Sequence, residues 1–402
     1  MKFNFRIYYI ILFLIVVISS NRVFALDFPK VDSKIIEIYD LTDDKIIYEV
    51  DSTKKTSIAS LTKIVTTITA IESISNLDEE VIITNDILNT VRWDASKAGL
   101  KVGDKLTYKD LLYASMLPSG ADATNSIAIA SSGSIDSFVG KMNDLVSKLG
   151  LSNTHFVNVT GLDAEGHYST VDDIRKILEY ALNNELFKSI YTTREYTLSN
   201  GLTVKSTIIK YNSSGMDTSK ILGSKTGFTE DAGYCLSSLS NINSHEFITI
   251  VLNAEYKDNK YYNIVDTVNL IDFLLDNYNN QVLVKKDEVV KNLPVRLSNV
   301  DTYDVHAIKD ITMYLPSDYD KDKIKIDYTG LDHLSFMNKV GDKIGSIKYY
   351  YDNELISEDD VILESKLEIS IKKIIKEYFY LFIGIPIIVI IIIVIKKKKC
   401  IN

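Results

Sequence analysis

The chain has few of the residues from which covalent and metal-based sites are built. Its 402 residues include two cysteines, Cys235 and Cys400, which are too few for a disulfide framework, so the fold must rest on packing. The five histidines form no His-Glu-x-x-His pair and no close ligand spacing, which argues against a zinc site. No basic patch interleaved with aromatic residues stands out, and the formal net charge is −9, so nucleic acid is not an expected partner. We therefore expect no metal and no cofactor.

Apolar residues, by contrast, make up 46% of the sequence. A chain of this length and composition can bury two cores of ordinary size, which excludes a disordered or fibrous protein. The sequence contains no internal repeat, and the one low-complexity segment is a run of lysines near the C-terminus. Two domains are therefore expected between the ends of the chain.

Residues 1–25 have the pattern of a signal peptide. Lys2 and Arg6 precede an apolar run over residues 8–18, and residues 23–25 place small side chains where a signal peptidase cleaves. An uncleaved N-terminal anchor is the alternative, but the apolar run is shorter than the roughly 20 residues that a membrane span needs. We expect cleavage after residue 25 and export of the chain.

Residues 378–395 are almost purely aliphatic and are followed at once by four lysines. This pattern predicts a single transmembrane helix whose short basic tail, residues 396–402, lies in the cytoplasm by the positive-inside rule. The preceding chain then lies outside the cell and is anchored to the cell membrane. A segment lying flat on the membrane is the alternative, but residues 387–395 offer no polar face to water.

The spacing of apolar residues between these ends predicts an α+β fold. Residues 33–50 alternate as in a β-hairpin, and later segments fall into helices followed by a cluster of strands. This order favours an antiparallel sheet flanked by helices. Helices are expected at residues 60–71, 107–117, 121–130, 135–149, 171–183 and 264–275, the first, second and fifth opened by Ser57, Thr107 and Thr170. Strands are expected at residues 221–228, 234–239 and 247–254, after a hairpin at residues 196–209.

From about residue 281 the pattern changes to short alternating segments separated by turn residues. Such segments occur at residues 304–308, 323–328 and 344–351. They predict a separate small all-β domain. The expected domains are therefore an α+β domain over residues 26–279 and an all-β domain over residues 280–370.

Ser60 and Lys63 are the first candidates for chemistry. They form a Ser-x-x-Lys pair at the start of a predicted helix, where side chains at i and i+3 share one face. The same spacing occurs at two other places, Ser52 with Lys55 and Ser370 with Lys373. Only Ser60 begins a helix whose other face is apolar. Burial there would lower the pKa of Lys63 and make it a base near neutral pH.

The second candidate is Lys225-Thr226-Gly227, the only Lys-Thr-Gly in the sequence, on a predicted strand. A lysine on a strand is usually a solvated edge residue, and a strand glycine often marks close approach by another chain or a ligand. In a functional interpretation, Gly227 lets a peptide substrate lie alongside the strand. Lys225 then adds a cation that lowers the pKa of a neighbouring lysine.

Ser119 is the third candidate, in a loop where Pro118 and Gly120 interrupt a helix. Alone it is an ordinary loop serine. The order Ser-x-x-Lys, loop serine, Lys-Thr-Gly is, however, the constellation of penicillin-binding proteins and class A β-lactamases.

The chain resembles the low-molecular-weight penicillin-binding proteins of the D-alanyl-D-alanine carboxypeptidase type. Residues 59–66 (ASLTKIVT) are similar to the nucleophile helix of that family, residues 223–236 to its catalytic strand, and residues 155–170 to a further stretch typical of it. One position departs from the pattern. The middle motif of the family is Ser-x-Asn, whereas residues 119–121 here read Ser-Gly-Ala. Asn125, one turn later, is a candidate to reach the same space.

The resemblance implies a serine-type D-Ala-D-Ala carboxypeptidase with the fold shared by β-lactamases and DD-peptidases. Ser60 would attack the carbonyl of the penultimate D-alanine, neutral Lys63 would take its proton, and Ser119 would relay that proton to the leaving amine. The backbone amides of Ser60 and Phe228 would form the oxyanion hole. The residues implied to hold the substrate are Lys225, Thr226, Gly227 and Thr229.

The implied partners are peptidoglycan stem peptides that end in D-Ala-D-Ala, processed in cell-wall synthesis and remodelling, and β-lactam antibiotics as covalent inhibitors. Two alternatives remain open. A serine β-lactamase shares the constellation, although the appended β domain and the C-terminal span favour a peptidase held at the wall. A non-enzymatic wall-binding protein with a decayed site is the other, and Ala121 is the residue that suggests it.

Overall fold

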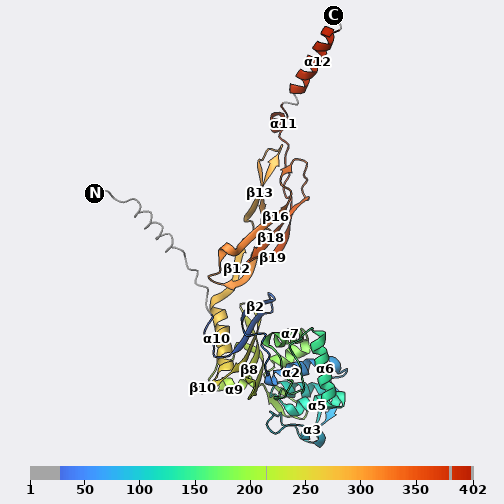
Figure 1. Ribbon diagram of the computed structural model, residues 1–402, viewed down its shortest axis with the longest axis vertical. Helices are drawn as coiled ribbons and strands as arrows, with labels where there is room; N and C mark the ends of the chain where they lie inside the picture. The colour runs from blue at the N-terminus through green and yellow to red at the C-terminus, as the bar shows by residue number, and fades with distance from the viewer. Residues whose placement is uncertain (1–27, 214, 380–382, 400–402) are drawn as a thin grey trace, which may run out of the picture. The chain divides into compact units, whose positions relative to one another are not determined.

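The computed structural model describes residues 28–213, 215–379 and 383–399. Two compact units divide the chain, one over Asp27–Tyr278 and one from Asn279 onward. Figure 1 shows the first as a unit of helices around a sheet and the second as a unit of strands followed by helices. The predicted signal peptide, residues 1–25, lies outside the described residues.

A five-stranded antiparallel sheet forms the middle of the first unit. Its strands are β1 (Ile35–Asp40), β2 (Lys45–Val50), β7 (Ile221–Thr229), β8 (Gly233–Ile242) and β9 (His245–Ala254). Their order is β2-β1-β9-β8-β7, so the N-terminal hairpin joins the last strand, with Ile38 opposite Thr249. All six residues of β1 are buried, as expected of a strand covered on both faces. β7 lies at the edge of this sheet.

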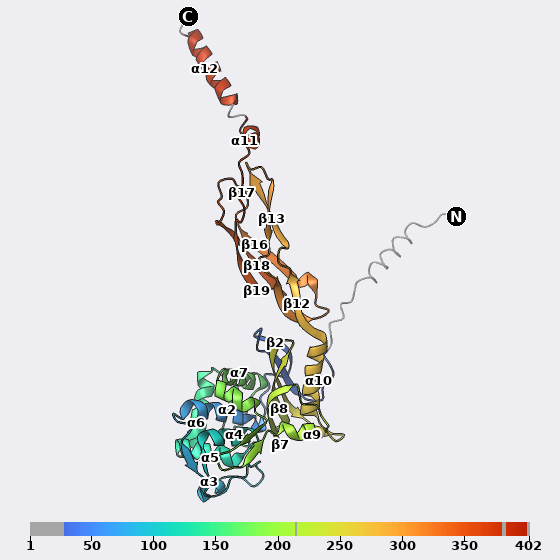
Figure 2. The same ribbon diagram turned by 180° about the vertical axis from the view of Figure 1, so that it is seen from behind.

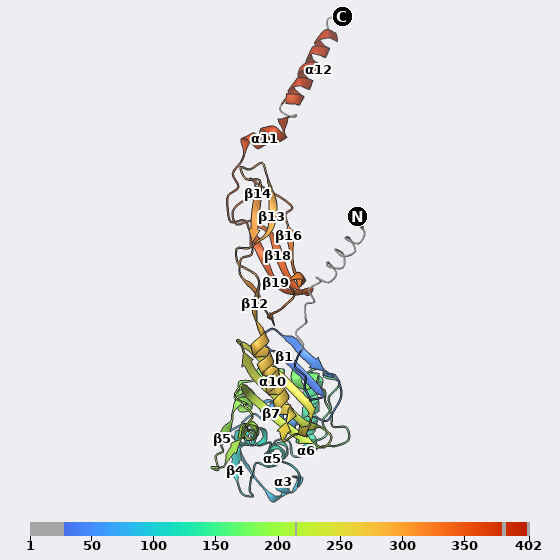
Figure 3. The ribbon, with the colours of Figure 1, turned by 90° about the vertical axis from the view of Figure 1, so that its left-hand side faces the viewer.

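Helices cover both faces of the sheet. α10 (Tyr262–Asn277) packs on β8 and β9, and α7 (Val171–Leu182) packs on β1 and β9. Figures 1 and 2 show α10 on one side of the sheet and α7 with the other helices on the opposite side. Figure 3 looks onto the face that α10 covers. The predicted α+β arrangement of a sheet flanked by helices is confirmed.

α2 (Thr62–Ser73) lies at the centre of the helical layer. The sequence predicts one buried face, but every residue from Thr62 to Ala70 is buried because other helices surround α2. The remaining helices of this unit are α3 (Asn85–Asn89), α4 (Tyr108–Met116), α5 (Ala121–Ser132), α6 (Ile135–Lys148), α8 (Glu185–Thr192) and α9 (Ile208–Ser213). Short strand pairs are β3 (Glu80–Ile82) with β4 (Lys105–Thr107), β5 (Glu195–Thr197) with β6 (Thr203–Lys205), and β10 (Tyr256–Lys257) with β11 (Lys260–Tyr261).

Two of the three predicted helix caps are confirmed. Thr107 Oγ1 accepts from the Asp110 amide at 3.0 Å to open α4, and Thr170 Oγ1 accepts from the Asp173 amide at 3.0 Å to open α7. The prediction for the first helix is wrong. Ser57 does not cap it, because a 3-10 turn, η1 (Ala59–Leu61), precedes α2.

The second unit is built from β-strands around a small apolar core. Its sheets have the orders β12-β15, β14-β13-β17 and β16-β18-β19. Leu293, Val305 and Ile347 are among the buried residues that these sheets share. The strands are β12 (Tyr278–Val284), β13 (Val289–Arg296), β14 (Thr302–His306), β15 (Ile311–Pro316), β16 (Ile324–Gly330), β17 (Leu334–Ser335), β18 (Lys343–Tyr351) and β19 (Glu354–Ile362), with a 3-10 turn η2 (Lys321–Lys323). The predicted C-terminal β domain is confirmed.

Two helices follow the β domain, α11 (Ile371–Glu377) and α12 (Ile385–Lys399). Among the residues that the structure describes, no helix is long and apolar enough to cross a membrane. α12 has 15 residues, which make about 22 Å of helix against a hydrocarbon core of roughly 30 Å. Residues 380–382, within the predicted span of residues 378–395, lie outside the described part of the chain. The predicted transmembrane helix is therefore not shown.

Candidate active site

Ser60 lies on a tight turn immediately before α2. Its neighbour Ala59 adopts a φ of 47°, in the left-handed region. Two glycines from distant segments pack against this turn. A Cβ on Gly161 would lie 1.9 Å from Ala59 O, and a Cβ on Gly227 would lie 2.9 Å from Ser60 N. Only glycine fits at these two positions, so the turn is held from both sides.

The absence of a side chain at Gly227 makes room for a different neighbour from the one that the sequence suggests. The sequence interpretation leaves room at Gly227 for a substrate. In the structure Gly227 is buried, and the room that it leaves is filled by the turn at Ala59 and Ser60. β7 and the serine turn therefore lie in direct contact.

Lys63 is buried beneath Ser60 and hydrogen-bonded to it. Lys63 is 2% exposed. Its Nζ donates hydrogen bonds to Ser60 Oγ at 3.2 Å and to Thr160 O at 2.7 Å. Burial lowers the pKa of Lys63 to about 7, with the carboxylate of Asp122 acting in the opposite direction. Near neutral pH this amine can therefore accept the proton of the Ser60 hydroxyl.

In the other two Ser-x-x-Lys pairs, a side chain interacts with a residue outside the pair. Ser52 Oγ donates to Glu49 Oε2 at 2.5 Å. Lys373 forms an ion pair with Asp301 at 2.6 Å, and Ser370 precedes α11. Of the three pairs, only Ser60 and Lys63 share a hydrogen bond, which agrees with the choice made from the sequence.

Lys225 is buried as well, at 1% exposed, so the solvated edge interpretation of this strand lysine is wrong. Its Nζ donates to Thr226 O at 2.7 Å. Burial holds the pKa of Lys225 well below its ordinary value, and the charge of Lys63 adds to that lowering. The positive charges of Lys63 and Lys225 thus repel each other in one buried site of low dielectric constant. This repulsion disfavours the state in which both amines are protonated.

The remaining predicted residues of β7 differ in exposure and in partners. Thr226 Oγ1 lies 2.6 Å from Thr207 Oγ1, and Thr229 Oγ1 donates to Asp163 Oδ1 at 2.7 Å. Phe228 is half exposed, and its ring packs on the ring of Tyr234 with centroids 4.4 Å apart. β7 therefore presents two fixed hydroxyls on either side of an aromatic side chain at the sheet edge.

Ser119 lies between α4 and α5 in a strained conformation. Its φ is 63°, in the left-handed region that non-glycine residues rarely adopt. The residue is 4% exposed, and its Oγ has no hydrogen-bond partner in the described part of the chain. Ser119 thus makes no hydrogen bond to Ser60 or Lys63 here. It offers a buried hydroxyl that a ligand could satisfy.

Asp122 was not among the site residues predicted from the sequence. Its carboxylate accepts the backbone amides of Ala98, Gly99 and Leu100 at 2.8, 2.9 and 3.0 Å. The residue is almost completely buried, and its charge also acts on Lys63. Asp122 therefore fixes residues 98–100 against the start of α5. A buried acid just after a loop serine is the signal that could have pointed to it.

Asn158 is a second residue without a predicted role. Its Oδ1 accepts the amides of Thr160 at 3.1 Å and Gly161 at 2.7 Å, and its Nδ2 donates to Leu162 O at 2.9 Å. Asn158 thereby shapes the loop that offers Thr160 O to Lys63. Its pairings depend on the path of the loop, so sequence spacing alone does not reveal them.

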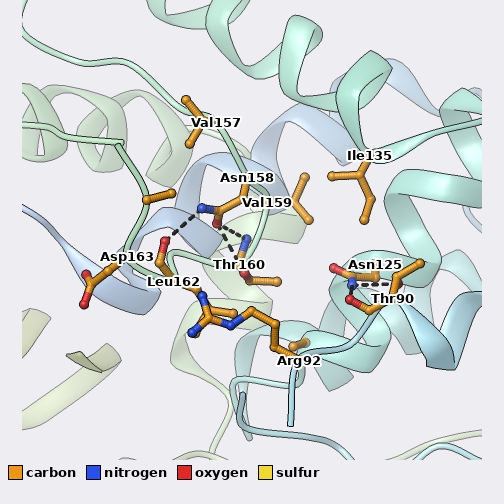
Figure 4. A pocket seen from close by; sticks show the side chains of 12 residues that line it. Thr90, Arg92, Asn125, Ile135, Val157, Asn158, Val159, Thr160, Leu162 and Asp163 are labelled. Carbon is orange, nitrogen blue, oxygen red and sulfur yellow. Dashed lines mark hydrogen bonds between the residues drawn. The ribbon is translucent and has the colours of Figure 1, made fainter. Parts of the chain in front are cut away.

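A pocket of about 250 Å³ opens beside these residues. Figure 4 shows it between the side chains of Thr90 and Asn125 on one side and the loop with Asn158 and Thr160 on the other. Arg92 also lines the pocket. Because Thr160 O is also the acceptor for Lys63, the pocket adjoins the serine site.

One cluster of possible metal ligands occurs in the described residues, at Asp40, Asp43 and His245, whose ligand atoms lie within 4.8 Å of one another. His245 Nδ1 and Asp40 Oδ2 are already hydrogen-bonded at 2.8 Å. None of the predicted site residues contributes to this cluster, so it has no part in the serine site.

Comparison with protein families gives two matches. The D-alanyl-D-alanine carboxypeptidase family matches residues 22–256, and the C-terminal domain of penicillin-binding protein 5 matches residues 278–369. The first match covers more than half of the chain, and it includes all of the predicted site residues.

Two curated relatives illustrate the likeness. The chain is 27% identical over 328 residues to D-alanyl-D-alanine carboxypeptidase DacF of Bacillus subtilis, covering 81% of this chain and 83% of that protein. It is 36% identical over 203 residues to the D-alanyl-D-alanine carboxypeptidase of Streptomyces sp. (strain K15), covering 47% of this chain and 70% of that protein.

Solved structures share the fold. Penicillin-binding protein 5 from Haemophilus influenzae has a TM-score of 0.61 at 21% identity and covers 86% of this chain and all of its own. The Streptomyces K15 DD-transpeptidase has a TM-score of 0.56 at 29% identity and covers 62% of this chain and 98% of its own.

Proposed function

The chain belongs to the D-alanyl-D-alanine carboxypeptidase family, and on this premise we propose that it removes the terminal D-alanine from peptidoglycan stem peptides through an acyl-enzyme on Ser60. The observation that carries the proposal is the buried amine of Lys63. It lies within hydrogen-bond distance of Ser60 Oγ and has a pKa near 7. A hydroxyl paired with a neutral amine of this kind is an activated nucleophile.

In the acylation step, Ser60 Oγ forms a bond to the carbonyl carbon of the penultimate D-alanine. Lys63 Nζ takes the hydroxyl proton as the bond forms. The tetrahedral intermediate collapses by breaking the bond to the terminal D-alanine nitrogen, which takes up a proton and leaves. Ser119, whose buried hydroxyl lacks a partner in the described part of the chain, is suited to carry that proton from Lys63. Water then hydrolyses the acyl-enzyme.

The oxyanion of the tetrahedral intermediate needs preorganised donors. The backbone amides of Ser60 and Phe228 are the proposed pair. The contact of Gly227 with the Ser60 backbone supports this pairing, because it holds β7 next to the serine turn. Loss of one such donor lowers the rate of acyl transfer by about 100- to 1000-fold.

The terminal carboxylate of the substrate requires a cationic and hydrogen-bonding surface. Lys225 supplies the charge while Lys63 is neutral, and Thr226 and Thr229 carry hydroxyls on the same strand. The bond between Thr226 and Thr207 presets the orientation of the Thr226 hydroxyl, and a preset donor loses less conformational entropy when the carboxylate binds. Thr229 donates its one hydroxyl proton to Asp163, so it must give up that bond to donate to the carboxylate.

The activity can be tested with an acetylated tripeptide ending in D-Ala-D-Ala. We expect release of one equivalent of D-alanine per peptide by the wild-type chain and none by Ser60→Ala. A chain that binds the peptide but releases no D-alanine would be a wall-binding protein with a decayed site. Rapid hydrolysis of penicillin without peptide cleavage would instead favour a serine β-lactamase, which differs by fast deacylation.

We also propose that residues 378–395 anchor the chain in the cell membrane, with the exported units outside and the lysine tail in the cytoplasm. The support is the composition of α12, whose aliphatic side chains from Ile385 to Ile395 are exposed. A continuous apolar surface of this kind is unfavourable in water and stable in lipid. Trypsin added to intact cells should spare the lysine tail and should cut it after permeabilisation. Cutting of the tail in intact cells would contradict this orientation.

A further inference from the structure

His167 is a buried histidine with a hydrogen-bond partner at each ring nitrogen. The residue is 5% exposed. The backbone amide of Val157 donates to Nδ1 at 3.2 Å, and Nε2 lies 2.8 Å from Thr62 Oγ1. A ring nitrogen that accepts from an amide carries no proton, so the single proton of the neutral ring is on Nε2. Burial lowers the pKa of His167 to about 4, which keeps the ring neutral near pH 7.

The tautomer of His167 decides which group receives the proton of the Thr62 hydroxyl. Because Nε2–H donates to Thr62 Oγ1, the one hydroxyl proton of Thr62 is donated to Ala59 O, which lies 2.9 Å away. Threonine in a helix populates two rotamers, and the bond from His167 favours the one that makes this contact. If Nε2 lacked its proton, the hydroxyl would donate to the ring instead. Val157, His167 and Thr62 therefore form a directional chain of hydrogen bonds that ends on Ala59 O.

Ala59 O and the backbone N–H of Ser60 belong to the same trans peptide unit. Such a unit is planar, and its C=O and N–H point in opposite directions, so a bond that orients Ala59 O also orients the Ser60 N–H. The Thr62 amide donates to Ala59 O as well, and a second donor restricts the rotation of the peptide plane further. The turn needs such contacts, because Ala59 holds a strained left-handed φ of 47°.

We propose that His167 is a positioning residue for the oxyanion hole. Acting through the Thr62 hydroxyl, it directs the Ser60 N–H toward the position where the carbonyl oxygen of the substrate becomes an oxyanion. This inference rests on the proposed function, in which that N–H is one of the two oxyanion-hole donors. A preorganised donor stabilises the transition state only if it points at the developing charge. Rotation of this peptide plane should therefore slow acylation without weakening the reversible binding that precedes it.

A purely structural role for His167 would depend on its other ring nitrogen. The bond from Val157 ties the ring to its loop, and the ring of Phe156 packs edge-on against it with centroids 5.4 Å apart. Two amide substitutions separate the roles. His167→Gln can place an N–H donor near the position of Nε2, whereas His167→Asn can place an acceptor near Nδ1 but is too short to reach Thr62. Positioning predicts faster acylation in His167→Gln, and a structural role predicts the reverse order.

Stopped-flow labelling of Ser60 with a reporter penicillin over a range of concentrations measures both quantities. It gives the acylation rate constant and, separately, the dissociation constant of the noncovalent complex. His167→Asn should lower the rate constant about tenfold, less than the roughly 100- to 1000-fold cost of losing a donor outright, and should change the dissociation constant less than about twofold. His167→Gln should recover most of the lost rate.

His155→Leu is the matched control on the same loop. His155 is exposed, and its Nδ1 donates to Gly166 O at 2.8 Å, so this substitution also removes a bond from a histidine to the loop backbone. The chain of hydrogen bonds from Val157 to Ala59 O does not include His155. The variant should therefore acylate at the wild-type rate, even if its thermal stability falls.

Thr62→Val provides a second route if the His167 variants do not fold. It keeps the shape of the side chain but removes the hydroxyl, so acylation should again slow about tenfold, and Thr62→Ser should restore it. Adding His167→Asn to Thr62→Val should cost no further rate if the histidine acts through that hydroxyl.

The outcomes separate this inference from the proposed function. If wild-type Ser60 does not label, the proposed function fails. If it labels, three results overturn only the positioning role of His167. These are acylation no faster in His167→Gln than in His167→Asn, additive losses in the double variant, and an unchanged rate in Thr62→Val.

Discussion

Lys63 is the residue at which burial sets the chemistry. Its pKa lies near 7 in the folded chain because the amine is desolvated. Only the neutral amine can take the Ser60 proton, so the acylation rate should rise with pH and level off above a midpoint near 7. Stopped-flow labelling with a reporter penicillin between pH 5.5 and 8.5 measures this directly. Lys63→Arg should abolish labelling, because a guanidinium stays protonated. Labelling by that variant at the normal rate would contradict the base role.

The charge of Asp122 should move this midpoint. The carboxylate favours protonated Lys63, so it raises the pKa of the amine. Asp122→Asn removes the charge, and because it keeps only one of the two carboxylate oxygens that accept the amides of residues 98–100, it also weakens that contact. The midpoint of the labelling profile should therefore shift to lower pH. Asp136→Asn, at an exposed position in the first turn of α6, should leave the midpoint in place. An upward or absent shift for Asp122→Asn would show that this electrostatic contact is unimportant.

Burial of Lys63 should also cost stability in a pH-dependent way. In the unfolded chain lysine stays protonated up to about 10.5, whereas in the folded chain it loses its proton near 7. The cost is therefore fully present below pH 7 and fades as pH rises toward 10.5. Lys63→Met should stabilise the chain at pH 7 by up to about 4 kcal/mol while abolishing activity. Thermal melts at pH 7 and pH 9.5 should show a smaller gap at the higher pH. A variant that is destabilised at pH 7 would contradict this account.

Among the elements, the contact between β7 and η1 depends on a glycine. A Cβ at Gly227 would lie 2.9 Å from both Ala59 Cβ and Ser60 N, so Gly227→Ala should push the serine turn away from the strand. We expect the acylation rate to fall by about 100-fold or more, since small displacements of reacting groups carry costs of that size. Gly140→Ala is the control, because its Cβ would meet nothing within 4 Å on α6. That change should be neutral or stabilising by about 0.5–1 kcal/mol. Equal effects of the two changes on labelling would be the contrary result.

Helices and strands with strong local signals were predictable from the sequence. The caps at Thr107 and Thr170 and the strand cluster from residue 221 follow from side-chain chemistry and spacing that act within a few residues. The start of the first helix did not follow, because the left-handed φ of Ala59 is held by Gly161 and Gly227, which are about 100 and 170 residues away. Tertiary contacts override local propensity there.

In the candidate site too, some residues were predictable from local sequence and others were not. Ser60 and Lys63 were predictable, because their contact is set by one helical turn and the apolar face of α2 implied burial. Asp122 and Asn158 were not assigned roles, because their partners are backbone amides and carbonyls of loops whose paths the sequence does not define. The burial of Lys225 was missed for a related reason. An edge strand is usually solvated, but the serine turn, α8 and α9 pack on β7, and Lys225 is buried.

For the whole molecule, the site residues all lie within the first unit, residues 27–278. Removal of residues 377–402 should therefore release a soluble chain with unchanged kcat/KM. The cut leaves the pairing of Lys373 with Asp301 intact. A cut after residue 369 removes that pairing and serves as a control for stability of the β unit. Loss of activity in the longer fragment would mean that the C-terminal segment supports the site.

The central claim is that Ser60 is the nucleophile, and peptide mapping of a penicillin adduct tests it most directly. The β-lactam amide imitates the acyl bond of the substrate, and its tethered leaving group keeps the adduct on the enzyme. After labelling of the whole chain with reporter penicillin and digestion, mass spectrometry should place one adduct on the peptide that contains Ser60, and Ser60→Ala should not label. An adduct on Ser52 or Ser370, or labelling of Ser60→Ala at the wild-type rate, would contradict the account.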